Sequence, residues 1–258
     1  AERLAVVLRQ FEVAVDLGTP GDAVRRALMA SDKVGAIVSA SAWARGPLAV
    51  VADEEALPFR DGAIDLVVSA LSLQFANDLP GVLVQIRRAL RPDGLLLAAL
   101  LGGDTLTELR QAFAQAEAEV EDGISPRVAP FADLRELGAL LQRAGFALPV
   151  TDVDRVTVRY ASPMALMQDL RRMGATNVLT ERRRKPLRRA TLMRVIEIYG
   201  ERFADADGRI RATFEIVWLS GWAPHDSQQQ PLKPGSAQQR LADALGAKEQ
   251  SAGEKAKR

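Results

Sequence analysis

The sequence predicts an α/β fold built on a doubly wound, mostly parallel sheet. Segments typical of strands and of helices alternate through the first part of the chain, which implies right-handed crossovers between parallel strands. A continuous apolar run at residues 95–101 is typical of a strand that is buried on both faces. With 258 residues, the chain is long enough for one large α/β domain but too short for two ordinary domains with linkers.

The elements expected in the first half follow from apolar periodicity and turn residues. Apolar side chains at helical spacing predict that residues 1–11 are the end of an amphipathic helix that leads into the first strand. That strand stops at Asp16, and Pro92 and Gly94 close the last helix of this half. The other predicted elements are a helix at 23–29, strands at 34–39, ending at 53, at 64–70 and at 95–101, and a helix at 79–94.

Capping residues place the elements of the second half. Thr105 and Glu108 fit a capping box that opens a helix reaching about residue 119, and Ser162 followed by Pro163 opens a later helix. The other predicted elements are a helix at 133–144 and strands at 153–160 and 212–222. We expect a main domain at 1–225 with a helical insertion at about 162–206 before the last strand, and a flexible polar tail at 226–258.

Composition excludes several classes of function. The chain has no cysteine, which excludes thiolate metal sites and cysteine nucleophiles, and its single histidine, His225, excludes a multi-histidine metal site. Lys and Arg total 34 against 33 Asp and Glu, so no net charge attracts nucleic acid. No apolar run reaches the roughly 20 residues that a membrane span needs. We therefore expect a cytoplasmic protein without a metal, a nucleic-acid partner or a membrane span.

The turn after the first strand carries the strongest functional signal. In the segment VAVDLGTPGDAVRRAL, residues 13–28, an apolar run stops at Asp16, and Gly18 and Gly21 precede a helix. Glycines let backbone N–H groups approach a ligand closely, while the carboxylate can accept from a hydroxyl or an ammonium. The pattern predicts a nucleotide-type cofactor site, although a strand-to-helix turn with two glycines is also ordinary loop chemistry.

Four segments taken together resemble the class I S-adenosylmethionine-dependent methyltransferases: DLGTPG (16–21), ADEEALPFRDGAIDLVVS (52–69), LRPDGLLL (90–97) and AGF (144–146). The resemblance implies a seven-stranded Rossmann-like sheet, S-adenosylmethionine as cofactor and S-adenosylhomocysteine as product. In that family an acid after the third strand lies beside the adenine, and Asp53 takes this role here. The residues that the resemblance places at the cofactor are Asp16, Gly18, Thr19, Gly21, Ser41, Asp53, Glu54, Ser69, Ala70 and Leu71.

Longer segments, at 71–94, 100–110, 125–146 and 221–237, resemble the methyltransferase-fold assembly factors of respiratory complex I and their bacterial relatives. A more distant resemblance is to the malonyl-acyl-carrier-protein O-methyltransferases of biotin synthesis. Together these imply methyl transfer to a carboxylate or to a protein side chain. The alternatives are hydroxylation of an arginine, which is credited to the assembly factors, and a non-catalytic chaperone that binds S-adenosylmethionine. A mitochondrial member would lie on the matrix side.

One position departs from the methyltransferase pattern. The family carries an acid at the end of the second strand that accepts both ribose hydroxyls, and Ser41 stands near that place here. The loss of a charge-assisted contact costs roughly 1.5–3 kcal/mol by general magnitudes. The sequence therefore leaves the ribose without its expected acceptor.

The acceptor side is defined by fewer residues. Gln74 and Asn77 follow the strand that faces the reacting sulfonium in this fold, and Asp104 follows the next strand, so these three are the catalytic candidates. Helix capping explains Asn77 and Asp104 equally simply. The basic run Arg182–Arg194 predicts a docking surface for a protein or carrier-protein substrate, with a solvated helix face as the alternative.

Overall fold

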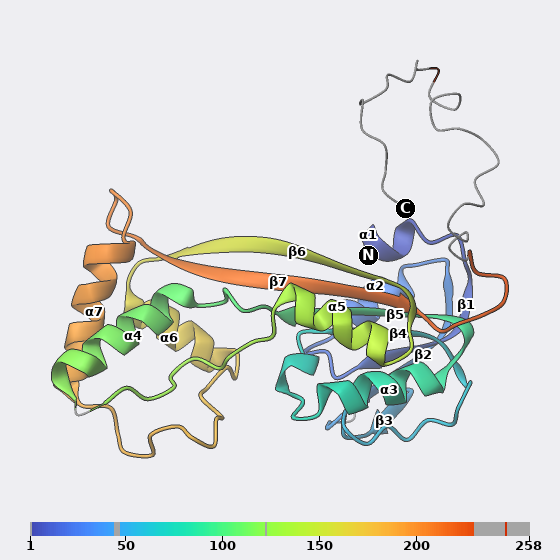
Figure 1. Ribbon diagram of the computed structural model, residues 1–258, viewed down its shortest axis with the longest axis horizontal. Coiled ribbons are helices and arrows are strands. Elements are labelled where there is room, and N and C mark those ends of the chain that lie inside the picture. Colours follow the sequence, from blue (N-terminus) through green and yellow to red (C-terminus); the bar gives the residue numbers. More distant parts are fainter. Residues whose placement is uncertain (1, 44–46, 122, 230–245, 247–258) are drawn as a thin grey trace, which may run out of the picture. The chain divides into compact units, whose positions relative to one another are not determined.

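The structure is a computed structural model that describes residues 2–43, 47–121, 123–229 and 246 (Figure 1). The chain divides into two compact units, Ala1–Pro224 and His225–Arg258. The helices and strands described below belong to the first unit. The predicted tail at 226–258 lies mostly outside the described residues.

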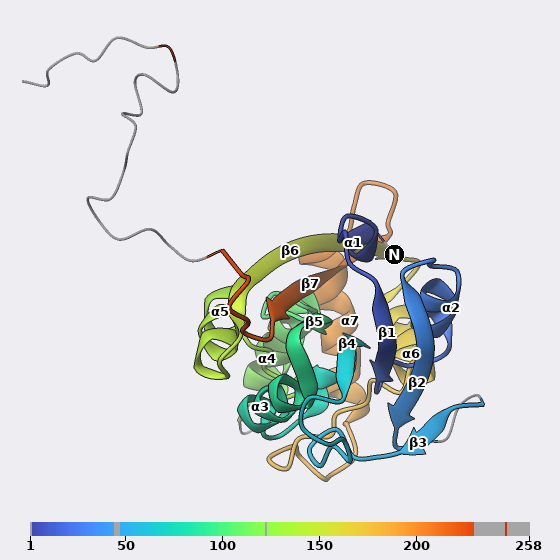
Figure 2. The same ribbon diagram turned by 90° about the vertical axis from the view of Figure 1, so that its right-hand side faces the viewer.

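The first unit is built on a seven-stranded sheet in the order β3-β2-β1-β4-β5-β7-β6, which can be followed in Figure 2. The strands are β1 (Phe11–Leu17), β2 (Val34–Ser41), β3 (Ala49–Val51), β4 (Ile64–Ala70), β5 (Leu90–Leu101), β6 (Ala147–Tyr160) and β7 (Ile210–Trp222). The pairs from β3 to β5 are parallel, whereas β7 is antiparallel to β5 and β6. The predicted α/β class with a mostly parallel seven-stranded sheet is confirmed.

Helices cover both faces of the sheet. They are α1 (Glu2–Ala5), α2 (Ala23–Met29), the 3-10 turn η1 (Leu73–Phe75), α3 (Leu79–Ala89), α4 (Thr107–Val120), α5 (Leu134–Arg143), α6 (Pro163–Arg172) and α7 (Arg189–Phe203). Leu83 of α3 and Leu137 of α5 belong to one buried cluster with Val15 of β1. Leu4 of α1 and Leu28 of α2 belong to a second cluster with other strand residues. The sheet is therefore doubly wound.

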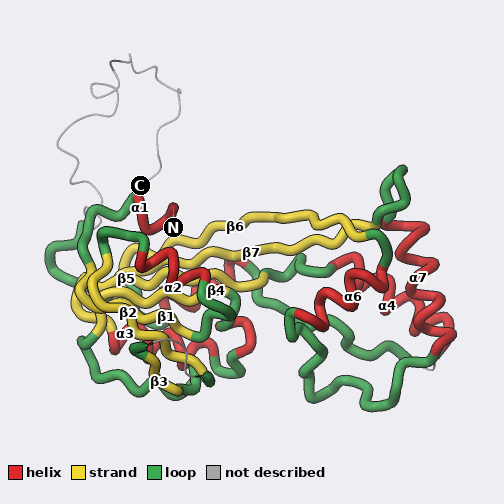
Figure 3. The backbone as a smooth tube through the Cα atoms, turned by 180° about the vertical axis from the view of Figure 1, so that it is seen from behind, coloured by secondary structure: helices red, strands yellow, loops and turns green. Residues whose placement is uncertain are grey.

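The two antiparallel strands continue past the parallel sheet as a ribbon, seen in Figure 3. β5 pairs with β7 only from Ile216 to Trp222, whereas β6 pairs with it as far as Ile210. Helices α4, α6 and α7 gather on this ribbon, where Phe113, Leu166 and Ile198 are buried in one cluster. The distal half of this ribbon thus has a hydrophobic core of its own.

The predicted capping box at Thr105 and Glu108 is wrong. Glu108 Oε2 accepts from the backbone N–H of Thr213 at 3.0 Å, and Thr105 Oγ1 accepts from the N–H of Glu215 at 3.1 Å. Helix α4 begins at Thr107 behind Leu106, whose φ is 55°. The reason is that β5 pairs with β7 only as far as Ile216. The N–H groups of Thr213 and Glu215 in β7 therefore have no partner in β5, and buried backbone donors must find acceptors.

Several predicted boundaries also shift: β3 ends at Val51 rather than at 53, β6 begins at Ala147 rather than at 153, and two more have a clear cause. The N-terminal helix ends at Ala5 rather than near Phe11, because Lys33 Nζ donates to the carbonyl oxygens of Leu4, Ala5 and Val7 and so closes the helix early. At the other boundary, α3 ends at Ala89, and the segment with Pro92 and Gly94 belongs to β5. Hydrogen bonds of Asp93 and Gly94 with Ala223 hold that segment next to the end of β7.

Candidate functional site

The carboxyl ends of the central strands bring the predicted cofactor residues to one edge of the sheet. Asp16 is the sixth residue of β1, is only 5% exposed, and stands in register with Ser39 of β2 and Val68 of β4. The N–H of Gly18 donates to the carbonyl of Ala40 at 2.7 Å. Parallel strands that end together leave a crevice at this edge, the place where open α/β sheets bind ligands.

Gly18 lies at the centre of this edge. Its φ of +68° is in the left-handed region, and a Cβ there would overlap Ser72 Oγ and Glu54 Oε1. Gly21 also has a positive φ, +77°, but a Cβ on it would meet nothing within 4 Å. Gly18 is therefore required by space as well as by conformation, whereas Gly21 is required by conformation alone.

Hydrogen bonds fix the two loops that flank Gly18. Thr19 Oγ1 accepts from the N–H of Ala70 at 3.1 Å, which ties the turn after β1 to the end of β4. The next residue, Leu71, has a φ of 57°, and its N–H donates to the carbonyl of Ala99 at 2.8 Å. Gln74 Nε2 donates to the carbonyl of Leu71 at 2.8 Å. Gln74 thus supports a strained backbone position beside the candidate site.

Other predicted site residues form hydrogen bonds within the loops that follow the strands. Ser41 Oγ donates to the carbonyl of Trp43 at 2.7 Å, and Asp53 Oδ1 accepts from the N–H of Glu55 at 2.9 Å. The backbone N–H of Asn77 donates to Glu55 Oε1, and Asp78 rather than Asn77 caps α3. Buried Ser69, 1% exposed, lies in β4 next to Ala70.

Asp104 belongs to a different polar group. Its Oδ2 forms an ion pair with Arg155 of β6, and Arg155 Nε also pairs with Glu215 of β7 at 3.2 Å. The Arg155 and Asp104 side chains are 63% and 52% exposed, so their pair lies at the surface, whereas the Glu215 side chain is only 10% exposed. Asp104 therefore stands at the carboxyl end of β5 without a contact to the Gly18 turn among those described.

Sequence reasoning missed three residues here: Ser72, Arg155 and Glu215. Ser72 could have been found, since it directly follows the predicted residues Ser69, Ala70 and Leu71. Nothing in the sequence pairs Arg155 with Glu215, because the two residues come from separate strands and meet only through the β6–β7 pairing.

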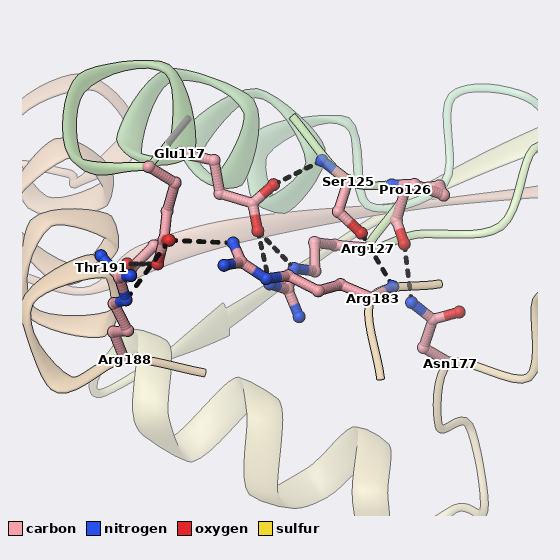
Figure 4. A network of polar contacts seen from close by, with 9 residues as sticks. Glu117, Ser125, Pro126, Arg127, Asn177, Arg183, Arg188 and Thr191 are labelled. Atoms are coloured by element: carbon pink, nitrogen blue, oxygen red, sulfur yellow. Dashed lines mark hydrogen bonds and ion pairs between the residues drawn. The ribbon is translucent and has the colours of Figure 1, made fainter. Parts of the chain in front are cut away.

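The basic run Arg182–Arg194 is partly committed to contacts within the chain, as Figure 4 shows around α4. Glu121 Oε2 pairs with Arg183 at 2.9 Å and with Arg188 at 3.5 Å, although the Glu121 side chain is only 2% exposed. The Thr191 hydroxyl, followed by the two guanidinium groups, holds the pKa of Glu121 below its ordinary value. The exposed members of the run include Arg184, Lys185 and Arg189.

Charge reversal separates these two kinds of arginine. Arg183→Glu should lower the midpoint of urea unfolding, because it places a second carboxylate beside Glu121 in a site that water scarcely reaches. Arg184→Glu, at an exposed position one residue away, should leave the midpoint nearly unchanged. Equal midpoints for the two variants would contradict the internal role of Arg183.

Two kinds of site are absent from the described residues. These residues contain no group of three or more His, Asp or Glu side chains that could hold a metal ion. Within the same residues, no helix combines the length and the apolar composition that crossing a membrane requires.

Comparisons with known proteins fit the fold. The family model described as "Methyltransferase domain" matches residues 15–98. The chain is 38% identical over 252 residues to "Arginine-hydroxylase NDUFAF5, mitochondrial" of Danio rerio, covering 94% of this chain and 78% of that protein. It is 42% identical over 193 residues to the malonyl-[acyl-carrier protein] O-methyltransferase of Laribacter hongkongensis (strain HLHK9), covering 75% and 62%. The solved structure of BH2331 from Bacillus halodurans C-125 has a TM-score of 0.56 at 16% identity, covering 87% and 97%.

Proposed function

The chain belongs to the family of the arginine hydroxylase NDUFAF5, and we propose that it is an enzyme that uses S-adenosylmethionine to methylate a carboxylate or a protein side chain. The observation that carries the proposal is the convergence of three loops on Gly18. The turns after β1, β3 and β4 meet there at the carboxyl edge of the sheet, and only a residue without a Cβ fits against Ser72 and Glu54.

The residues of this edge fit such a cofactor. Asp16 and Glu54 provide carboxylates for hydroxyl or ammonium groups. The loops around Gly18, Glu54 and Ser72 form a cradle, and the hydrogen bond from Ala70 N–H to Thr19 Oγ1 joins two of these loops. When bound, S-adenosylmethionine supplies a methyl group on a sulfonium, which is already an activated donor. The remaining task of the chain is to align the acceptor, and alignment alone can supply much of the rate.

In the proposed reaction, the acceptor oxygen or nitrogen forms a bond to the methyl carbon while the carbon–sulfur bond breaks and its electron pair stays on sulfur. A carboxylate needs no proton removed, whereas a side-chain amine or guanidine loses one to water or to a nearby base. Of the three catalytic candidates, Gln74, Asn77 and Asp104, we keep Gln74 as the residue that positions the acceptor, because its contact with the Leu71 carbonyl lies beside the Gly18 turn. The exposed arginines of the basic run would dock an acidic protein or carrier protein.

A second candidate is hydroxylation of an arginine. It is favoured by the extent of the match, since the similarity to the Danio rerio arginine hydroxylase covers 94% of the chain and that to the O-methyltransferase covers 75%. Hydroxylation replaces C–H by C–OH, so it consumes dioxygen and two electrons from an external reductant, and the second oxygen atom leaves as water. In either case we expect the chain to act in the cytoplasm or, within a mitochondrion, in the matrix.

One experiment separates the candidates. The protein is incubated with S-adenosylmethionine carrying a labelled methyl group and with two acceptors, a malonyl carrier protein and arginine-containing peptides, and the acceptors are weighed by mass spectrometry. Transfer of the label supports methylation, and gain of an oxygen atom that depends on dioxygen supports hydroxylation. Binding of S-adenosylhomocysteine in calorimetry without either product supports a non-catalytic chaperone. Failure to bind either cofactor form overturns the proposal.

A further inference from the structure

Two side chains fill the space in front of the Gly18 backbone. Ser72 Oγ donates to Glu54 Oε1 at 3.2 Å, and a Cβ on Gly18 would overlap both oxygens and lie 2.9 Å from Ser72 Cβ. Glu54 follows β3 and Ser72 follows β4, so their hydrogen bond crosses the cradle that the proposed function assigns to the cofactor. A ligand that lies against Gly18 has to replace this bond.

The other groups near the missing ribose acceptor are already engaged. Ser41, at the end of β2, has its hydroxyl on the carbonyl of Trp43 and carries no charge. Asp53 faces back to the N–H of Glu55 in its own turn. Glu54 is half-buried and reaches across to the Gly18 turn. Among the carboxylates of the β3 loop, it is the one that lies against the Gly18 turn.

In a proposal that rests on the use of S-adenosylmethionine, we propose that Glu54 accepts hydrogen bonds from the ribose hydroxyls, in place of the acid missing at Ser41. Ser72 is the donor to Glu54 when no ligand is bound. Without ligand, the Ser72 hydroxyl satisfies Glu54. When a nucleoside binds, its hydroxyls take over this carboxylate, and Ser72 turns to another partner. Hydrogen bonds to a charged acceptor are strong enough to make Glu54 a main determinant of affinity.

Calorimetry with S-adenosylhomocysteine tests the exchange. Glu54→Gln should weaken binding by about ten- to a hundredfold, the range that loss of a charge-assisted hydrogen bond implies. Ser72→Ala should bind at least as tightly as the parent, because it removes only the competing donor. Glu55→Gln is the matched control, since Glu55 accepts from the N–H groups of Asn77 and Asp78 instead, and it should bind as the parent does.

A second ligand distinguishes a contact of Glu54 with the ribose from a contact with the amino-acid part of the cofactor. 5′-Methylthioadenosine has the ribose hydroxyls but no ammonium, so Glu54→Gln should weaken it by a similar factor. Unchanged affinity for this ligand, or equal losses in Ser72→Ala and Glu54→Gln, would overturn the inference. Failure of the parent protein to bind S-adenosylhomocysteine would instead contradict the proposed function. Because Gln keeps an oxygen for the Ser72 hydroxyl, the thermal midpoint of Glu54→Gln should match that of the parent and exclude misfolding.

Discussion

Replacement of Arg127 by alanine should lower the free energy of unfolding by about 3–5 kcal/mol, the range found when one partner of a buried ion pair is removed. Glu117 of α4 has a side chain that is 0% exposed, and Arg127 donates to it through Nε at 2.7 Å and through a second nitrogen at 2.5 Å. The N–H of Ser125 is the other donor to this carboxylate (Figure 4). Without Arg127, the Glu117 charge would stay buried with one backbone donor among the described residues.

The control for this prediction is Arg88→Ala. Arg88 pairs with Asp61 at 3.2 Å, but both side chains are more than half exposed, so the loss should stay within about 1 kcal/mol. Urea unfolding measures both variants, and unchanged slopes show that the denatured state is comparable. The double variant Glu117→Leu with Arg127→Met should recover part of the loss, since it removes the charge as well as its partner. Similar midpoints for Arg127→Ala and Arg88→Ala would contradict the prediction.

Gly18→Ala should abolish measurable binding of S-adenosylhomocysteine and destabilise the fold. A left-handed conformation costs an L residue about 1–2 kcal/mol, and the new Cβ would in addition overlap Ser72 and Glu54. Gly21→Ala carries the same conformational cost at φ +77°, but its Cβ would point into open space. The difference between the two variants in urea unfolding therefore measures the overlap alone.

A further variant keeps this prediction testable if Gly18→Ala folds poorly. Adding Ser72→Gly removes one of the two side chains that the new Cβ would overlap, and the other contact is with the end of the flexible Glu54 side chain, so stability should recover toward that of Gly21→Ala. Binding should stay weak, because the Cβ still occupies the face on which the ligand would lie. If Gly18→Ala binds S-adenosylhomocysteine as the parent does, the cradle lies elsewhere.

Local patterns in the sequence predicted much of the fold. Ser162 caps α6 through its contact with the N–H of Ala165, and α2 and β4 have the predicted limits. Asp133 begins the capping box of α5. In each case the deciding contacts lie within a few residues, so the sequence contains both partners side by side. The glycine turn after β1 was predicted for the same reason, because backbone conformation there depends on Gly18 itself.

The candidate site could be predicted only as a set of loops. The order of the strands implies that the turns after β1, β3 and β4 meet at one edge. It does not say that Glu54, rather than Ser41 or Asp53, reaches Gly18, since side-chain direction depends on how each loop closes. Ser72 was missed because its partner lies 18 residues away in another loop.

By itself, the sequence determined the α/β class, the alternation of elements and the glycine turn, because these follow from periodicity and from contacts between near neighbours. Only the tertiary structure decided how polar side chains are used. Glu108 fits a local cap, yet it binds the backbone of Thr213, 105 residues away. Arg183 belongs to a run that resembles a solvated face, yet it pairs with buried Glu121. Buried donors and charges must be satisfied wherever the fold leaves them, and that requirement outweighs local preference.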